Sequence, residues 1–121
     1  MNYEFTFILL CLNEEKTIGF CINEIKNYIN KKKINAEILV VDNNSEDKSA
    51  EVAKQNGARV ILKKEKGYGN ALIAGTKNAK GRYCIMGDAD GSYDFSNLDD
   101  FVEGIRSGYD LVVGNRFGGR N

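Results

Sequence analysis

Short apolar runs alternate along the chain with stretches in which apolar residues recur every three or four positions. The runs are typical of buried strands, and the recurring spacing is typical of helices that cover a sheet. The expected strands are Phe5–Leu10, Ile38–Val41, Val60–Leu62, Tyr83–Met86 and Leu111–Val113. The inward positions of the four expected helices are Ile18, Ile22, Ile25 and Ile29; Ala50 and Ala53; Ala71, Leu72 and Ala74; and Leu98, Phe101, Val102 and Ile105.

Polar residues predict where these helices begin and end. Side chains that can cap a helix N-terminus precede three of them, with acidic residues close by. The predicted caps are Asn13, Ser45 and Ser96, and the acidic residues are Glu14, Glu15 and Asp99. At the other ends, Lys31–Lys33 is expected to close the first helix and Asn56–Gly57 to stop the second.

This alternation predicts an α/β fold with an open, doubly wound, mostly parallel sheet that helices cover on both faces. The 121 residues are enough for one domain, residues 1–121, and they contain no internal repeat. Gly118–Asn121 has the composition of a loop, so we expect a truncated sheet that forms one lobe of a longer protein. Apolar surface left open near Leu111–Val113 is expected to favour a homodimer.

Composition excludes several functional classes. The 17 basic and 17 acidic residues balance, which gives no overall attraction to nucleic acid. Histidine is absent, and this excludes Ser-His-Asp catalysis and histidine metal sites. Three cysteines without a C-x-x-C pair, and no apolar run of membrane-spanning length, predict a reduced cytoplasmic protein. Glu4 before the first apolar run favours a strand there over a signal peptide.

Polar clusters follow the first four expected strands. They are Asn13–Glu14, Asp42, the Gly67 region, and the pair Asp88 and Asp90. Carboxyl ends of parallel strands meet at one edge of a sheet, and ligands of open α/β sheets bind there. We therefore expect the functional site at this edge.

The Asp88-Ala89-Asp90 segment carries the most chemical information. Two carboxylates at positions i and i+2 can share one Mg²⁺ or Mn²⁺ and leave coordination positions for substrate phosphates. A calcium loop is one alternative, because Asp88, Asp90, Ser92 and Asp94 match EF-hand positions, although Tyr93 replaces the turn glycine. A solvated acidic turn is the other alternative.

Gly67-Tyr68-Gly69 forms part of a G-x-G-x-x-G pattern between a strand and a helix. A dinucleotide-binding loop is one interpretation. Leu72 stands in place of the third glycine, and Lys63–Lys66 separates the strand from the glycines, so a flexible loop is the alternative. Both glycines permit close approach of the backbone to a ligand.

Charge is uneven within the zero total. The segment from Lys54 to Arg82 has eight basic residues and one acidic residue, whereas the segment from Asp88 to Asp110 has seven acidic residues and one basic residue. Two oppositely charged solvated faces explain most of these residues. A few of the basic residues are candidates for anion ligands beside a cation site.

Five motifs stand in a fixed order along essentially the whole chain: Leu12–Ile18, Leu39–Ser45, Lys66–Ala71, Met86–Tyr93 and Val113–Phe117. Together they resemble the N-terminal, nucleotide-binding part of family 2 glycosyltransferases with the GT-A fold. The resemblance is greatest to the dolichol-phosphate mannosyltransferase-like enzymes, which glycosylate polyprenyl phosphates. The Asp-x-Asp segment then corresponds to the metal motif of that family.

The resemblance implies a nucleotide-sugar-binding domain that uses Mg²⁺ or Mn²⁺ for inverting transfer from a UDP- or GDP-linked sugar. The implied pathway is the synthesis of cell-envelope polysaccharide or lipid-linked sugar. A polyprenyl-phosphate acceptor is already anionic at neutral pH and needs no general base. Such an acceptor would place the protein in the cytoplasm, peripheral to the inner face of the membrane.

Roles for individual residues are carried over from the same resemblance. The nucleotide-binding residues it implies are Leu10, Cys11, Asn13, Glu14, Asp42, Asn44, Gly67, Asn70 and Asp88. The implied metal ligands are Asp88, Asp90 and Ser92, and the implied catalytic residues are Asp88, Asp90 and Arg116, with Arg116 near a donor or acceptor phosphate. Two positions depart from the family pattern: Cys11 replaces a usual proline, and Leu12 replaces a frequent tyrosine or alanine.

Two other functions remain open at this point. Members of the family continue beyond the equivalent of residue 121. Many of those that glycosylate hydroxyl groups have their catalytic base in that later part, and no candidate for a catalytic base follows Arg116 here. A nucleotide-binding fragment without catalysis is therefore one alternative. A dinucleotide-dependent oxidoreductase is the other. Metal dependence of nucleotide binding separates it from a glycosyltransferase, because NAD binding needs no Mg²⁺.

Overall fold

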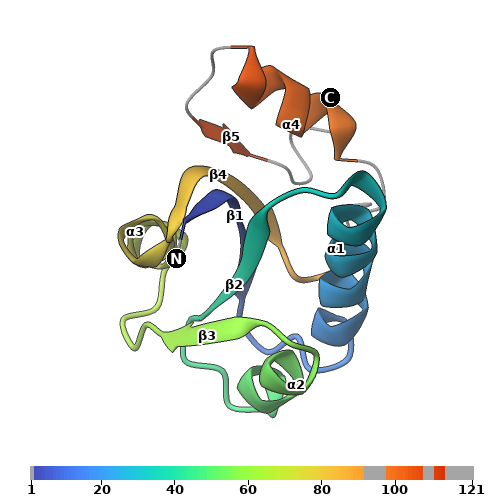
Figure 1. Cartoon of the computed structure of the whole chain (residues 1–121). Coiled ribbons are helices and arrows are strands. Elements are labelled where there is room, and N and C mark those ends of the chain that lie inside the picture. The colour runs from blue at the N-terminus through green and yellow to red at the C-terminus, as the bar shows by residue number, and fades with distance from the viewer. Residues whose placement is uncertain (1, 92–97, 108–110, 114–121) are drawn as a thin grey trace.

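Strands and helices alternate strictly in the computed structural model, which describes residues 2–91, 98–107 and 111–113 (Figure 1). The strands are β1 (Tyr3–Cys11), β2 (Ala36–Asp42), β3 (Arg59–Leu62), β4 (Gly81–Asp88) and β5 (Leu111–Val113). The helices are α1 (Ile18–Lys32), α2 (Ser49–Gln55), α3 (Tyr68–Asn78) and α4 (Asp99–Arg106). Each predicted strand and helix is present, and the longer strands extend beyond the predicted runs.

The strands form a sheet in the order β3-β2-β1-β4-β5, in which all neighbours are parallel. This confirms the predicted doubly wound, parallel α/β architecture. The chain first moves outward from β1 to β3, and then returns to β4 on the other side of β1. The direction therefore reverses between β1 and β4, and the carboxyl ends of these two strands flank the crevice where such sheets bind ligands.

The two faces of the sheet have separate apolar cores because side chains alternate along each strand. Phe5, Phe7 and Leu9 of β1 belong to the core that also contains the inward residues of α1 and α4. Ile8 and Leu10 belong to the core under α3. Figure 1 shows α1 and α3 on opposite sides of the sheet.

Helix starts differ from the predicted ones. Helices α1, α2 and α4 have Thr17, Lys48 and Leu98 at the N-cap position, in each case without a side-chain cap hydrogen bond. Asn13 and Ser45 therefore cap no helix, and Glu14 and Glu15 precede the first turn of α1. The prediction was wrong because these two polar side chains bind the backbone of a distant loop: Ser45 Oγ accepts from Asn13 N–H at 2.9 Å, and Asn13 Oδ1 accepts from Glu46 N–H at 2.8 Å.

The predicted helix ends are confirmed. Lys31 and Lys32 lie in the last turn of α1, where positive side chains complement the helix dipole, and Lys33 follows with a left-handed backbone (φ 56°). Asn56 follows α2 as its C-cap residue. Ser96, the predicted cap before α4, lies outside the described residues, and that helix begins three residues later. Over the described ranges, no helix has both the length and the apolar composition that a membrane crossing requires.

Candidate functional site

The carboxyl ends of β1, β2 and β4 are aligned in one row. Leu10 lies opposite Asp88 of β4, and Cys11 lies opposite Asp42 of β2. Backbone hydrogen bonds continue the row beyond the strands: Ala89 N–H donates to Leu10 O at 3.1 Å, and Asn43 N–H donates to Cys11 O at 2.8 Å. The register thus brings together, at one edge, polar segments that are separated by more than 70 residues in the sequence.

A cavity of about 250 Å³ opens at this edge, where β1 and β4 flank the point at which the sheet order reverses. Its lining includes the carboxylate side chains Glu14, Asp88 and Asp90. Asp88 is the last residue of β4, and Asp90 follows it in the next loop. Since a strand rather than a helix precedes Asp88, the EF-hand alternative is wrong.

Besides Asn43 and Gly67, the rest of the wall consists of apolar or aromatic residues. Leu10 and Cys11 end β1, Leu12 follows them, and Tyr68 and Ala71 come from the first turn of α3. Burial raises the pKa of the Cys11 thiol to about 11, so this side chain is a neutral thiol at physiological pH. Leu12 and Tyr68 remain exposed although they are apolar or aromatic. The cavity therefore joins an acidic side to a surface that suits a flat, partly apolar ligand group.

The cavity unites six of the predicted site residues and leaves out others. Its lining includes Leu10, Cys11, Glu14, Gly67, Asp88 and Asp90, and does not include Asn13, Asp42, Asn44 and Asn70. Ser92 and Arg116 lie outside the described residues. The predicted nucleotide or metal roles of all these positions stay predictions.

Asp42 points to the other face of the sheet. Asp42 and Val40 are two positions apart in β2, so their side chains lie on the same face of the sheet, and Val40 belongs to the core that contains α1. The cavity opens on the other face, toward α3. The Asp42 carboxylate is buried and accepts a hydrogen bond from Ser45 Oγ, whose oxygen accepts in turn from Asn13 N–H. Asp42 thus supports the loop that follows β1 through Ser45.

Asn43 is a site residue that the sequence did not single out. Its buried side chain donates to Lys63 O and Glu65 O, both at 2.9 Å, and accepts from Gly67 N–H at 2.9 Å. Gly67 has φ +133°, a backbone conformation that favours glycine, and it is the N-cap residue of α3. Asn43 therefore fixes the entry to α3 beside the cavity. The strand alternation, which separates Asn43 from Asp42, was the signal that could have found it.

Reciprocal hydrogen bonds join the loops that follow β1 and β2. Three consecutive backbone N–H groups of the first loop donate to side chains of the second loop and of the first residue of α2: Asn13 to Ser45 Oγ, Glu14 to Ser49 Oγ and Glu15 to Asp47 Oδ2, at 2.9, 2.9 and 3.1 Å. Asn13 and Glu15 accept from backbone N–H groups of the second loop in return. The conformation of the chain around Glu14 is therefore set by tertiary contacts.

Burial and nearby like charges raise the pKa of Glu14. Burial is the larger cause, and the negative charges of Asp90, Asp47 and Asp88 add to it. Carboxylates that disfavour one another's ionisation around a cavity are a feature of sites that bind cations or transfer protons. The electrostatics of this edge favours a positively charged ligand component.

The donor set fits Mg²⁺ or Mn²⁺ held jointly with a substrate. Within residues 2–91, 98–107 and 111–113, no group of three or more His, Cys, Asp or Glu side chains is arranged to hold a metal ion. Asp88 and Asp90 supply two carboxylates at the cavity wall. Mg²⁺ in phosphate-transfer sites is bound by one or two carboxylates together with substrate phosphates and water, which matches this pair.

Comparisons with known proteins agree with the architecture. Residues 6–121 match the family model described as Glycosyl transferase family 2. The chain is 39% identical over 113 residues to the low-salt glycan biosynthesis hexosyltransferase Agl6 of Haloferax volcanii, and this alignment covers 93% of the chain and 27% of Agl6. It is 33% identical over 118 residues to the dolichyl-phosphate hexose transferase of the same organism, and this alignment covers 93% of the chain and 50% of the transferase.

A solved structure shows the same likeness in three dimensions. Glucosyl-3-phosphoglycerate synthase from Mycobacterium tuberculosis, in complex with Mn²⁺, uridine diphosphate and phosphoglyceric acid, superposes with a TM-score of 0.63 at 26% identity. The match covers 72% of this chain and 33% of that chain. The chain thus spans half or less of the length of these three proteins.

Proposed function

This chain belongs to glycosyl transferase family 2, and from that premise we propose that its cavity binds the nucleoside diphosphate of a nucleotide sugar, with a divalent cation, for inverting sugar transfer. Membership of this family overturns the oxidoreductase alternative. The observation that carries the proposal is the joint lining of one cavity by Asp88, Asp90 and an exposed apolar wall. A nucleoside diphosphate has the matching parts: a flat base and a charged diphosphate.

Asp88 and Asp90 would hold Mg²⁺ or Mn²⁺ against the diphosphate. The bound cation would supply neutralisation of the negative charge that develops on the leaving diphosphate. The structure of the Mycobacterium tuberculosis synthase with Mn²⁺ and uridine diphosphate supports this pairing of metal and nucleotide. Ser92 and Arg116 are further proposed contacts with the metal and with a phosphate.

Other residues at this edge have two proposed roles. Leu12 and Tyr68, which the sequence did not predict as site residues, would contact the base through their exposed apolar surfaces, and the predicted residue Gly67 would let the backbone approach the nucleotide. Asp42 and Asn13 would act on the nucleotide through the linked loops, since their side chains are bonded to Ser45 and Glu46.

A polyprenyl phosphate is the acceptor we propose. The relative from Haloferax volcanii named dolichyl-phosphate hexose transferase supports it. A phosphate oxygen is already negative at neutral pH, so it attacks the sugar without a general base, which suits a chain without histidine. The protein would then work at the cytoplasmic face of a membrane.

Titration calorimetry of this chain with UDP and with GDP, in Mn²⁺ and in EDTA, tests the proposal. We expect Mn²⁺ to strengthen the binding of one diphosphate at least tenfold, and Asp90→Asn to remove most of that gain. Asp100→Asn is the matched control, because Asp100 is exposed on α4, and it should bind as the parent does. Equal affinity of the parent in Mn²⁺ and in EDTA would overturn the proposal.

A further inference from the structure

The loop that carries Asp88 and Asp90 is held by the start of α1. Thr17 Oγ1 donates a hydrogen bond of 2.6 Å to the carbonyl oxygen of Ala89, a residue 72 positions further along the chain. Ala89 stands between the two aspartates, and its surface is completely buried. The N–H group of Ala89 donates to Leu10 O at 3.1 Å, so both polar backbone groups of this residue are fixed.

Thr17 also lies close to the loop just after Asp90. Gly91 has φ +80°, and a Cβ atom built on it would lie 3.3 Å from Thr17 Cγ2. The hydroxyl of Thr17 is thus bonded to the residue before Asp90, and its methyl group lies close to the residue after it.

Other hydrogen bonds are available to the Thr17 hydroxyl, but they are absent or longer than the bond to Ala89 O. Thr17 occupies the N-cap position of α1, where threonine ordinarily accepts a hydrogen bond from the backbone of the first turn, yet it makes no such cap bond. Glu14 O and Glu14 Oε1 are both 3.4 Å away, and a hydroxyl has only one proton to donate. At 2.6 Å, Ala89 O is by far the closest acceptor, so the loop takes the proton.

We propose that Thr17 is a positioning residue for the aspartate pair, an inference that rests on the proposed metal and nucleotide site. The carbonyl of Ala89 and the N–H of Asp90 belong to one planar peptide group. Fixing that carbonyl therefore fixes the direction in which the chain enters Asp90. The two carboxylates are then oriented before a cation arrives, and binding does not have to order the loop.

Three variants of the full chain test this inference by calorimetry with UDP in Mn²⁺ and in EDTA. Thr17→Val removes the hydroxyl and keeps the branched shape, and we expect the gain in UDP affinity from Mn²⁺ to fall about tenfold while affinity in EDTA is unchanged. Thr17→Ser restores the hydroxyl and should recover the gain to within about twofold. Gly91→Ala strains the left-handed backbone of the same loop (φ +80°) and places a methyl group 3.3 Å from Thr17 Cγ2, and it should also reduce the gain if Thr17→Val does not fold.

Each outcome decides the inference. A parent chain without any gain from Mn²⁺ overturns both the proposed site and the role of Thr17. A parent with the gain, and a folded Thr17→Val that keeps it, overturns the role of Thr17 alone. If Thr17→Val weakens UDP binding equally in Mn²⁺ and in EDTA, Thr17 has only a structural role and the inference is also wrong. If it does not fold, full retention of the gain by Gly91→Ala counts against the inference.

Discussion

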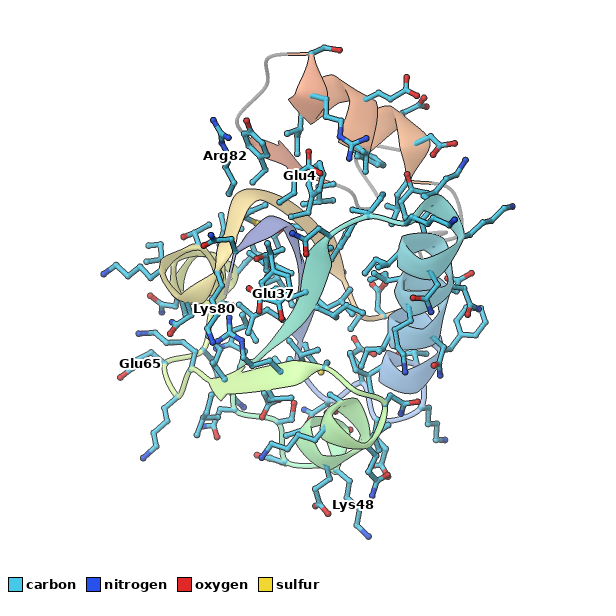
Figure 2. The ribbon with its side chains drawn as sticks, in the orientation of Figure 1. Glu4, Glu37, Lys48, Glu65, Lys80 and Arg82 are labelled. Atoms are coloured by element: carbon cyan, nitrogen blue, oxygen red, sulfur yellow. The ribbon has the colours of Figure 1, made fainter. Side chains whose placement is uncertain are left out.

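The two edges of the sheet carry acidic side chains in opposite electrostatic environments. The amino edge is the one at which the parallel strands begin, and the carboxylate of Glu37 is buried there. It accepts hydrogen bonds from Thr6 Oγ1 at 2.7 Å, from Arg59 Nε at 3.0 Å and from Lys80 N–H at 2.7 Å. Glu37 and Lys80 are labelled in Figure 2. Burial acts to raise the pKa of Glu37, but these hydrogen bonds outweigh it and lower the pKa.

At the carboxyl edge, the pKa of Glu14 is raised, first by burial and then by the charges of Asp90, Asp47 and Asp88. The carboxylates at the two edges therefore serve two different purposes. A carboxylate with a lowered pKa stabilises the folded state, as Glu37 does where it joins β1, β2, β3 and the start of β4. A carboxylate with a raised pKa destabilises the folded state in its ionised form, and a bound cation can offset that cost.

Replacing Gly81 by alanine should give the largest effect and tests how tightly the amino edge is packed. A Cβ atom at Gly81 would overlap the carbonyl carbon of Phe5 and lie 2.5 Å from Thr6 N, and backbone atoms cannot move aside as a flexible side chain can. We expect Gly81→Ala to lower the free energy of unfolding by about 3 kcal/mol or more in urea denaturation.

Gly69→Ala is the control at the opposite edge. Among the residues that the structure describes, none places a heavy atom within 4 Å of a Cβ built on Gly69, which lies within α3. Alanine favours the helix over glycine by about 0.5–1 kcal/mol, so this variant should be slightly more stable than the parent. A loss of stability in Gly69→Ala as large as that in Gly81→Ala would show that the two edges do not differ in packing.

Glu37→Gln should have the next largest effect. The substitution keeps the shape but removes the charge that Arg59 and the Lys80 N–H group bind, and Arg59 is left without its carboxylate partner. We expect a loss of about 1.5–3 kcal/mol in the free energy of unfolding, the range for hydrogen bonds to charged groups. Glu65→Gln removes an exposed ion pair with Lys63 and should unfold as the parent does.

The response to acid should depend on Glu37 as well. Its pKa is lower in the folded chain than in the unfolded chain, so its contribution to stability is present above the unfolded value, 4.5, and disappears as the pH falls through the folded value. Unfolding measured between pH 6 and pH 3 should therefore show a smaller loss of stability for Glu37→Gln than for the parent. Parallel curves for the two proteins would contradict the lowered pKa.

Glu14→Gln should give the smallest effect, with the opposite sign. It removes a charge that burial and three nearby aspartates disfavour, so the ligand-free chain should gain stability at pH 7, by less than about 1 kcal/mol because the site is partly open to water. The exposed Glu51→Gln is the matched control: it removes a charge that the dipole of α2 favours in its first turn, so it should not gain stability. A less stable Glu14→Gln would mean that Glu14 supports the fold rather than a ligand.

Local patterns in the sequence were enough to predict the strands, the helices and the edge of the sheet that carries the chemistry. The spacing of apolar residues is a local property that can be read directly from the sequence. It predicted each strand and the alternation of strands and helices along the chain. Asp88 stands at the end of an apolar run, which predicts a strand. All strands of a parallel sheet end at the same edge, so this position was enough to place Asp88 at the carboxyl edge. The five ordered motifs added the family, which is shown by the match over residues 6–121.

The way in which that edge is built depends instead on contacts between segments that are far apart in the sequence. The polar side chains Asn13 and Ser45 satisfy the local rules for helix caps equally well, but each binds the other's loop, more than 30 residues away. Thr17 reaches Ala89 across 72 residues, and the sheet register sets Leu10 opposite Asp88. A hydrogen-bonding side chain takes whichever partner the folded chain brings nearest, and that partner is a property of the assembled sheet rather than of the neighbouring sequence.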